Sequence, residues 1–354
     1  MNNLLIISYG NRIGGSELQC HKLKKIIDNP FWITISHTND KNENSYLNVD
    51  KKIFFKKLSL IQIFKISSEI FEIIKKRNIL NIYSSGFIPS IIGMLIKFKN
   101  RNINFVTAFR QNIRWMRLSH KFIYLLIFFF SNKIETNSYY YYCKLNKFFS
   151  KKIYLINNII LKKKKTYVPK IKKKIFTVGY VGKLRPIKNF KLLIKVFKIL
   201  LNNYSDIKIK FIGEDYKNNL KKELKIRNYK NFKFLDKVDN KNIFIEFENI
   251  DLLILTSIQE SNPNVVLEAN SCGIPVLMTS FESAEKIIIN GINGYLVNSK
   301  PYEFVTKILK LKENKFLLFK LSKSSYQFYN NNPDLDYFRK FYNNNIFKKN
   351  FYKS

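Results

Sequence analysis

The chain has 354 residues, of which 46% are hydrophobic, and it carries 63 Lys and Arg against 25 Asp and Glu. This length is sufficient for two domains with separate cores, and the hydrophobic content excludes an intrinsically disordered protein. The net charge of +38 would ordinarily indicate a nucleic acid or an anionic membrane as partner. Because Lys, Asn, Ile, Phe and Tyr are enriched along the whole chain, we attribute part of this charge to a general bias in composition and not to a binding partner. What remains is an attraction to acidic lipid headgroups, at ~1 kcal/mol per basic residue near the surface.

Cysteine spacing and apolar runs limit the cellular setting. Cys20, Cys143 and Cys272 lie far apart, without a CxxC pair or a histidine cluster, which predicts neither a zinc site nor a disulfide framework. The first ten residues lack the basic segment of a signal peptide. The longest apolar run, residues 122–130, is shorter than the ~20 residues that cross a bilayer. We therefore expect a cytoplasmic protein that does not span the membrane and can bind peripherally to its inner face.

Predicted strands and helices alternate through the first half of the chain. Residues 4–8 form an apolar run that predicts a buried strand, and Gly14 and Gly15 follow it before a helical pattern. Further strands are predicted at residues 52–55, 79–83, 105–108 and 133–136, with helices between them, including one over 61–76. This alternation predicts a mostly parallel sheet, and the strand, glycine loop and helix at its start are typical of a Rossmann-like domain. Glycines in such a loop let the backbone approach a ligand closely.

A lysine-rich segment separates this half from a second one. Residues 162–165 and 172–174 are all lysine and flank a Thr-Tyr-Val-Pro segment, and such charge resists packing. We place the domain boundary there, with a first domain over residues 1–165 and a second over 166–333. The second domain begins with a predicted strand at 176–181, followed by a basic loop that contains Lys183, Arg185 and Lys188 and by a helix at 190–201. Later strands are predicted at 208–212, 232–235 and 252–255.

Residues 251–275 combine a strand, a polar turn and a helix. The apolar run 252–255 suits a strand buried on both faces. Asn262 is a good N-cap and Pro263 fits the first helical position, so a helix is predicted to start near residue 263. Its free N–H groups, at Asn264, Val265 and Val266, would point out of the carboxyl edge of the sheet, where anions bind. Gly273 predicts a left-handed end of this helix.

Two carboxylates in this stretch are separated by seven residues. Glu260 lies on the loop, and Glu268 lies about one and a half turns into the predicted helix. Both could face one pocket, next to a diphosphate at the helix start. The spacing alone equally allows Glu260 to be a solvated loop residue and Glu268 to be an acid matched to the helix dipole.

This stretch resembles the C-terminal signature of the retaining glycosyltransferases of family four, the group 1 type. Glu260 and Glu268 match the E-x7-E motif, and the flanking S-x-x-E-x-x-P-N and E-A-x-x-C-G-x-P patterns match as well. The GGSE segment that starts at Gly14 is similar to the family's GGxE loop. The loop from Gly182 resembles G-R-L-x-x-x-K-N/G, with Lys183 where Arg is usual, and residues 290–297 are similar to a structural turn of the family.

The resemblance implies an α/β protein of the GT-B fold, with two Rossmann-like domains facing across a cleft. It implies an N-terminal acceptor domain, a C-terminal nucleotide-sugar donor domain, and a C-terminal helix at 334–354 that packs back on the first domain. The implied reaction is the retaining transfer of a sugar from a nucleoside diphosphate sugar to a glycan or lipid-linked acceptor, in the synthesis of cell-surface polysaccharide or lipopolysaccharide. No metal or other cofactor is implied.

The resemblance also implies roles for single residues. Lys183 and Lys188 would hold the donor diphosphate, where neutralising the leaving group is the main electrostatic task. Arg185 would compensate for the Arg that Lys183 replaces. Glu260 would contact the hydroxyls of the donor sugar, and Glu268 would hold the ribose. Gly14 and Gly15 would lie near acceptor and donor, and the amides of Asn264, Val265 and Val266 would bind phosphate.

One position departs from the family. Many relatives carry a histidine after the strand at 105–108, where this chain has Phe109, Arg110 and Gln111, so no histidine is assigned a role. Three alternatives stay open: a catalytically decayed GT-B protein, a nucleotide-sugar epimerase, and a basic nucleic-acid-binding module. The last is indicated by charge alone, since the sequence has no base-stacking motif or recognition helix, and we expect no nucleic acid as partner.

Overall fold

The computed structural model describes residues 3–10, 14–37, 48–111, 116–159, 175–215, 219–224, 229–236, 238 and 243–347. The chain divides into two compact units, Met1–Leu161 with Pro333–Ser354, and Lys162–Asn332. The lysine-rich boundary predicted at 162–174 lies outside the described residues, as does the end of the predicted C-terminal helix from residue 348 on.

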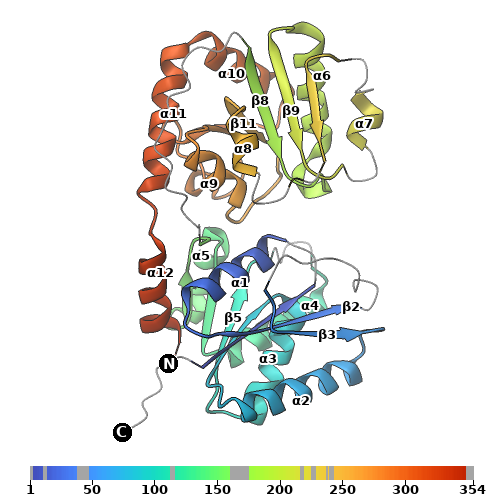
Figure 1. Cartoon of the computed structure of the whole chain (residues 1–354), viewed down its shortest axis with the longest axis vertical. Coiled ribbons are helices and arrows are strands. Elements are labelled where there is room, and N and C mark those ends of the chain that lie inside the picture. The colour runs from blue at the N-terminus through green and yellow to red at the C-terminus, as the bar shows by residue number, and fades with distance from the viewer. Residues whose placement is uncertain are drawn as a thin grey trace. The chain divides into compact units, whose positions relative to one another are not determined.

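The described part of the first unit contains a seven-stranded parallel sheet in the order β3-β2-β1-β4-β5-β6-β7. Its strands are β1 (Leu4–Tyr9), β2 (Phe31–His37), β3 (Lys51–Phe55), β4 (Asn81–Ser85), β5 (Asn104–Phe109), β6 (Lys133–Thr136) and β7 (Ile153–Leu155). Its helices are α1 (Gly15–Ile26), α2 (Leu60–Lys76), α3 (Phe87–Lys99), α4 (Leu118–Phe130), α5 (Tyr139–Phe149) and α12 (Leu335–Phe341), the last continued by a π-helical turn over Tyr342–Ile346 (Figure 1).

Both faces of this sheet are buried. Because side chains alternate along a strand, Leu4 and Ile6 of β1 pack with α1 and the C-terminal segment, whereas Leu5 and Ile7 pack with α2 and the helices after it.

Helix α2 illustrates how the sequence specifies these elements. The Ser59 hydroxyl caps its first turn by accepting the Gln62 N–H at 3.2 Å, and buried isoleucines recur along it at the spacing of one helical face.

The C-terminal segment is part of the first unit. The Nε of Arg339 on α12 donates to the Ile26 carbonyl at the end of α1 at 2.9 Å, and Asn104 of β5 donates to the Ile346 carbonyl at 2.9 Å. Phe338, Tyr342, Ile346 and Phe347 are buried in the same cluster as α1. The predicted return of the C-terminal helix to the first domain is therefore confirmed for residues 335–346.

The described part of the second unit contains a six-stranded parallel sheet in the order β10-β9-β8-β11-β12-β13. Its strands are β8 (Phe176–Val181), β9 (Ile207–Ile212), β10 (Phe232–Leu235), β11 (Leu252–Leu255), β12 (Val276–Thr279) and β13 (Gly294–Val297). Its helices are α6 (Phe190–Asn203), α7 (Asn219–Leu224), α8 (Ile243–Phe247), α9 (Asn264–Ser271), α10 (Pro301–Glu313) and α11 (Lys315–Asn330). The two parallel-sheet units confirm the predicted α/β class.

Two strands of the first sheet were not among those predicted, β2 in its interior and β7 at its edge. Among the described helices, none combines the length and the apolar character that crossing a bilayer requires.

Candidate functional site

Each sheet reverses its strand order at one point, and polar and charged side chains lie near that point. In the second unit the order reverses between β8 and β11, which are neighbours although β9 and β10 separate them in the chain. In the first unit it reverses between β1 and β4. Ligands of open α/β sheets bind outside the carboxyl ends of the strands at such switch points. The loops that follow β8 and β11, and those that follow β1 and β4, are therefore the places to examine.

Two hydrogen bonds tie the loops after β8 and β11 to each other. The Thr256 hydroxyl donates to the Lys188 carbonyl at 2.8 Å, and the Ile258 N–H donates to the Ile187 carbonyl at 2.9 Å. This backbone arrangement brings two predicted site residues together, because the Lys188 Nζ lies 2.5 Å from Glu260 Oε1. The same carboxylate oxygen accepts the Ser257 hydroxyl at 2.6 Å. Both charged side chains are mostly buried, at 24% and 13% exposed.

Lys183 lies on the same loop but has a different partner. Its ammonium contacts Glu214 Oε1 at 2.6 Å, on the loop after β9. The two loops approach so closely that a Cβ on Gly213 would lie 2.2 Å from the Gly182 carbonyl oxygen. Gly213 also has a φ of +139°, a conformation that glycine adopts readily and other residues do not. Arg185 is exposed, and no contact of its side chain with Lys183 or Glu214 is recorded in the described residues.

Helix α9 begins one residue later than predicted. Pro263, with a ψ of 119°, is the N-cap in place of Asn262, and helical conformation starts at Asn264. The prediction that the Val266 N–H is free was wrong, because it donates to the Pro263 carbonyl at 3.1 Å in a tight first turn. The predicted left-handed end is confirmed. Gly273 has a φ of +66°, and the Ile274 N–H reaches back to the Ala269 carbonyl at 2.9 Å, as in a Schellman motif.

Glu268 is half-buried on α9, and its charge acts on α11. The pKa of Tyr329 on α11 is raised, chiefly by burial, with the charges of Cys272 and Glu268 adding to the effect. Glu268 is therefore in electrostatic range of Tyr329, whereas Glu260 lies with Lys188.

Tyr180 of β8 is a further polar group under the loops of this unit. Its hydroxyl is buried and finds no hydrogen-bond partner among the described residues. Burial raises its pKa, and the negative charge of Glu260 raises it further. Tyr180 is thus a buried polar group within electrostatic range of Glu260.

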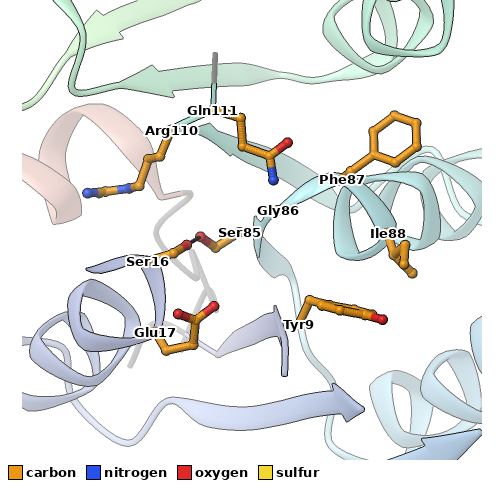
Figure 2. A pocket seen from close by; sticks show the side chains of 9 residues that line it. All are labelled: Tyr9, Ser16, Glu17, Ser85, Gly86, Phe87, Ile88, Arg110 and Gln111. Carbon is orange, nitrogen blue, oxygen red and sulfur yellow. Dashed lines mark hydrogen bonds between the residues drawn. The ribbon is translucent and has the colours of Figure 1, made fainter. Parts of the chain in front are cut away.

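The first unit has a pocket of about 310 Å³ at its own switch point (Figure 2). The pocket lies where β1, β4 and β5 end and where α1 and α3 begin. Its floor contains a contact between the Ser16 and Ser85 hydroxyls at 2.6 Å, which Figure 2 places at its centre. The lining combines polar and apolar side chains: Tyr9, Ser16, Glu17, Ser85, Gly86, Phe87, Ile88, Arg110 and Gln111.

Glu17 is the acidic residue of this pocket. Its carboxylate accepts the Gly14 N–H at 3.1 Å, and a Cβ on Gly14 would lie 2.5 Å from that carboxylate, so this glycine lets the side chain fold over the helix start. Burial raises the pKa of Glu17, and the backbone hydrogen bonds offset only part of this effect. The predicted Gly14 and Gly15 are exposed and open α1, while the pocket itself is lined by the two residues after them.

Arg110 is held by a buried network behind the pocket. It forms an ion pair with Glu135, donates to Asn158 Oδ1 at 2.7 Å and to the Tyr83 hydroxyl at 3.3 Å. Glu135 is fully buried, and its other carboxylate oxygen accepts the hydroxyl of Tyr342, from the C-terminal segment, at 2.7 Å. Burial is the largest influence on the pKa of Arg110 and lowers it, but the charges around it outweigh burial and raise the pKa overall. Arg110 is thus a fixed cation.

A comparison with protein families gives this site its context. Residues 162–331 match the family model of the glycosyl transferases group 1. The match covers almost the whole of the second unit, Lys162–Asn332. Its Lys188–Glu260 pair and helix α9 lie inside the matched residues.

Two curated relatives are similar to part of the chain. The chain is 26% identical over 146 residues to the capsular polysaccharide biosynthesis glycosyltransferase CapM of Staphylococcus aureus, a match that covers 40% of this chain and 38% of CapM. It is 29% identical over 155 residues to an uncharacterized glycosyltransferase of Haemophilus influenzae, covering 42% of each. The matched segments thus span less than half the length of these relatives.

Almost the whole chain is similar in fold to a structure solved with a nucleotide sugar. Anabaena HepE in complex with UDP-glucose superposes with a TM-score of 0.80, at 17% identity, over 96% of this chain and 97% of that chain. Together with the two parallel-sheet units, this likeness confirms the predicted GT-B fold.

The residues that line the pocket of the first unit were mostly missed from the sequence. Tyr9 ends β1, Ser85 ends β4, and Arg110 and Gln111 both follow β5, so only the order of these three strands brings the residues together. The available signal was their shared position, since each stands at the carboxyl end of a predicted strand. Within the described residues no group of three or more His, Cys, Asp or Glu could hold a metal ion, and metal independence stays a prediction.

Proposed function

We propose that this protein transfers a sugar, with retention of configuration and without a metal ion, from a nucleoside diphosphate sugar to a glycan or lipid-linked acceptor. The observation that carries the proposal is the Lys188–Glu260 pair at the switch point of the second sheet, inside the residues that match the family model. A cation there is in the place where α/β sheets bind phosphates.

The proposed reaction requires positive charge near the leaving group. As the bond between the anomeric carbon and the diphosphate breaks, negative charge grows on the phosphate and the sugar ring becomes cationic. Lys188 would neutralise the phosphate, with Lys183 and the α9 amides of Asn264 and Val265 as further donors. In the structure Lys188 is paired with Glu260. We propose that the diphosphate takes over this cation, which frees the Glu260 carboxylate to accept hydroxyls of the donor sugar.

Glu268 would hold the ribose of the donor. It stands on α9, beyond the first turn where the diphosphate would bind, and its carboxylate is partly exposed. A carboxylate in that position accepts two hydroxyl hydrogens, whereas an amide accepts with one oxygen only.

The pocket of the first unit has the composition of a carbohydrate site. Ser16, Glu17, Ser85 and Gln111 offer hydroxyl, carboxylate and amide groups, and Phe87 offers an apolar face. Sugar rings combine hydroxyl groups with apolar C–H faces, so this lining matches them on both counts. We propose that this pocket takes the acceptor. Similarity to the capsular polysaccharide glycosyltransferase CapM supports a role in cell-surface polysaccharide synthesis.

A donor panel tests the proposal. The protein is incubated without acceptor with UDP-, GDP- and ADP-sugars, and release of nucleoside diphosphate is measured. We expect release from one nucleotide class, with UDP-sugars first because HepE was solved with UDP-glucose. Binding of a nucleoside diphosphate without any release would indicate a catalytically decayed protein. The absence of both binding and release would contradict the proposal.

A further inference from the structure

Helix α4 of the first unit carries an apolar face that the described residues leave uncovered. The residues of this face recur at helical spacing and are between 36% and 82% exposed. They are Leu118, Phe122, Leu125, Leu126 and Phe129. The opposite side of the helix is buried, with Tyr124, Ile127 and Phe128 in the core. The face is therefore presented by a helix whose position is fixed.

Aromatic side chains from neighbouring helices extend this face at the carboxyl end of α4. Phe98, at the end of α3, is 52% exposed, and its ring centroid lies 4.2 Å from that of Phe130. Phe130 in turn packs against Phe129, with ring centroids 5.2 Å apart. Single exposed apolar residues are normal, but a contiguous group of this kind marks an interaction surface.

Basic side chains border the face. Lys152 donates to the Phe129 carbonyl at 2.7 Å, and its ammonium lies 5.6 Å from the centre of the Phe129 ring. On α5, Lys144 and Lys147 are exposed. Lys121 stands on α4 beside the apolar residues.

The same surface lacks acidic side chains. Between Glu72 and Asp206 the sequence has a single acid, Glu135, and that carboxylate is fully buried against Arg110. Helices α3, α4 and α5 therefore contribute cations and no anions. A protein partner would need a matching acidic and apolar surface, whereas an anionic bilayer offers negative headgroups above an apolar layer in one structure.

We infer that the exposed face of α4 docks in the interface of an anionic lipid bilayer. Phe122, Leu125 and Phe129 enter the boundary between headgroups and acyl chains, while the lysines around them contact the phosphates. This places α4 parallel to the membrane surface, in agreement with its length of 13 residues.

The buried side of α4 connects this face to the pocket. The Tyr124 hydroxyl donates to Gln111 Oε1 at 3.1 Å, and the Phe87 ring packs against both His120 and Tyr124, with centroids 4.7 and 5.0 Å apart. Gln111 and Phe87 line the pocket. One helix thus separates the pocket from the docking face. If the transferase function proposed above holds, on which this step alone depends, the acceptor is lipid-linked.

Vesicle binding tests the docking without any nucleotide sugar, so its outcome is independent of transferase activity. The full chain is sedimented with vesicles of phosphatidylcholine alone or mixed with phosphatidylglycerol, at low and high salt. We expect binding to the anionic vesicles at low salt and release as the Debye length falls from ~10 Å at ~0.1 M to ~3 Å at ~1 M salt. Phe122→Ser with Phe129→Ser should weaken this binding at least about tenfold.

The matched control is Phe316→Ser, on the exposed start of α11 in the second unit, at 77% exposed. It should bind vesicles as the wild type does. If the double variant does not fold, Leu118→Ser, at the most exposed position of the face, should weaken binding in the same direction. Equal vesicle binding by wild type and α4 variants would overturn the inference. The inference would also be overturned if the protein did not bind vesicles and instead formed a dimer that the α4 substitutions dissociate. A second copy of the chain would then cover the α4 face.

Discussion

The Lys188 ammonium lies 2.5 Å from the Glu260 carboxylate, although the two residues are 72 positions apart in the chain. Parallel strands β8 and β11 lie side by side in the sheet, and the loops that follow them meet at its carboxyl edge. Because both side chains are mostly buried, this contact is better shielded from water than a surface ion pair. It fixes a cation at the switch point of the sheet, and in the proposed reaction an incoming diphosphate would compete with Glu260 for it.

Glu268 is expected to determine donor affinity. Replacing it with Gln removes the charge and one acceptor, so Glu268→Gln should weaken the binding of the nucleoside diphosphate sugar by more than about tenfold, or ~1.4 kcal/mol. Isothermal titration calorimetry measures this directly. Glu223→Gln, at an exposed position of α7, is the matched control and should bind as the wild type does. An unchanged affinity in Glu268→Gln would exclude the proposed contact with the ribose.

Glu17 should make stability depend on pH. Burial raises its pKa above the ordinary 4.5, so the folded state holds this proton more tightly than the unfolded state. The stabilisation is complete below pH 4.5 and is lost as the pH rises through the raised pKa. The Gln side chain does not titrate, so Glu17→Gln does not lose this stabilisation as the pH rises. The free energy of unfolding of Glu17→Gln, relative to wild type, should therefore increase between about pH 4 and pH 7.

Urea denaturation at several pH values measures this difference. Glu313→Gln, at the exposed end of α10, is the control for the same substitution elsewhere. A difference between Glu17→Gln and wild type that stays constant with pH, or falls as the pH rises, would contradict the burial of Glu17.

Tyr342 should anchor the C-terminal segment to the first unit. Tyr342→Phe removes the hydroxyl that donates to Glu135 and leaves a carboxylate oxygen of a fully buried side chain without that donor. A loss of about 1–3 kcal/mol in the free energy of unfolding is expected. Tyr337→Phe, on α12 and 53% exposed, should cost less than about 0.5 kcal/mol. Equal effects of the two substitutions in urea denaturation would argue against the buried network.

Gly213 should be intolerant of any side chain. The added Cβ of Gly213→Ala would meet the Gly182 carbonyl oxygen at 2.2 Å, and the φ of +139° is strained for alanine. Since the obstacle is backbone, a cost of about 3 kcal/mol or more is expected. Gly291→Ala has a φ of +78° and no atom within 4 Å of the new Cβ, so it should cost only about 1–2 kcal/mol. Thermal and urea unfolding of both variants measure the difference between their losses in the free energy of unfolding. Equal losses would contradict the close approach of the two loops.

Much of the fold is predictable from local pattern. The bounds of β8, β10 and β11 coincide with the predicted ones, because each is a short apolar run between polar turns. Strand β2 carried a comparable signal, with Trp32, Ile33 and Ile35 after an Asn-Pro turn, and could have been found. Strand β7 has three residues at the sheet edge, too few for any periodicity to appear.

The candidate site was only partly predictable, because sequence does not specify the order of strands. The resemblance assigned Lys188 and Glu260 to one site, and the meeting of their loops brings them into contact. The pocket of the first unit depends on three strand ends, and Glu17, Ser85 and Arg110 share no motif in the chain. The start of α9 was misplaced by one residue because Pro263 fits both the N-cap and the first helical position, and only its ψ distinguishes them.

The most direct test of the account compares the release of nucleoside diphosphate by wild type and by Lys188→Ala, with the donor that the panel identifies. Lys195→Ala, an exposed lysine on the adjacent α6, is the matched control. The account predicts that Lys188→Ala lowers the turnover rate about 100-fold or more, the usual effect of removing one stabilising group from a developing anion, while Lys195→Ala leaves it unchanged. Turnover by Lys188→Ala at the wild-type rate would contradict the placement of the donor diphosphate at the Lys188–Glu260 pair.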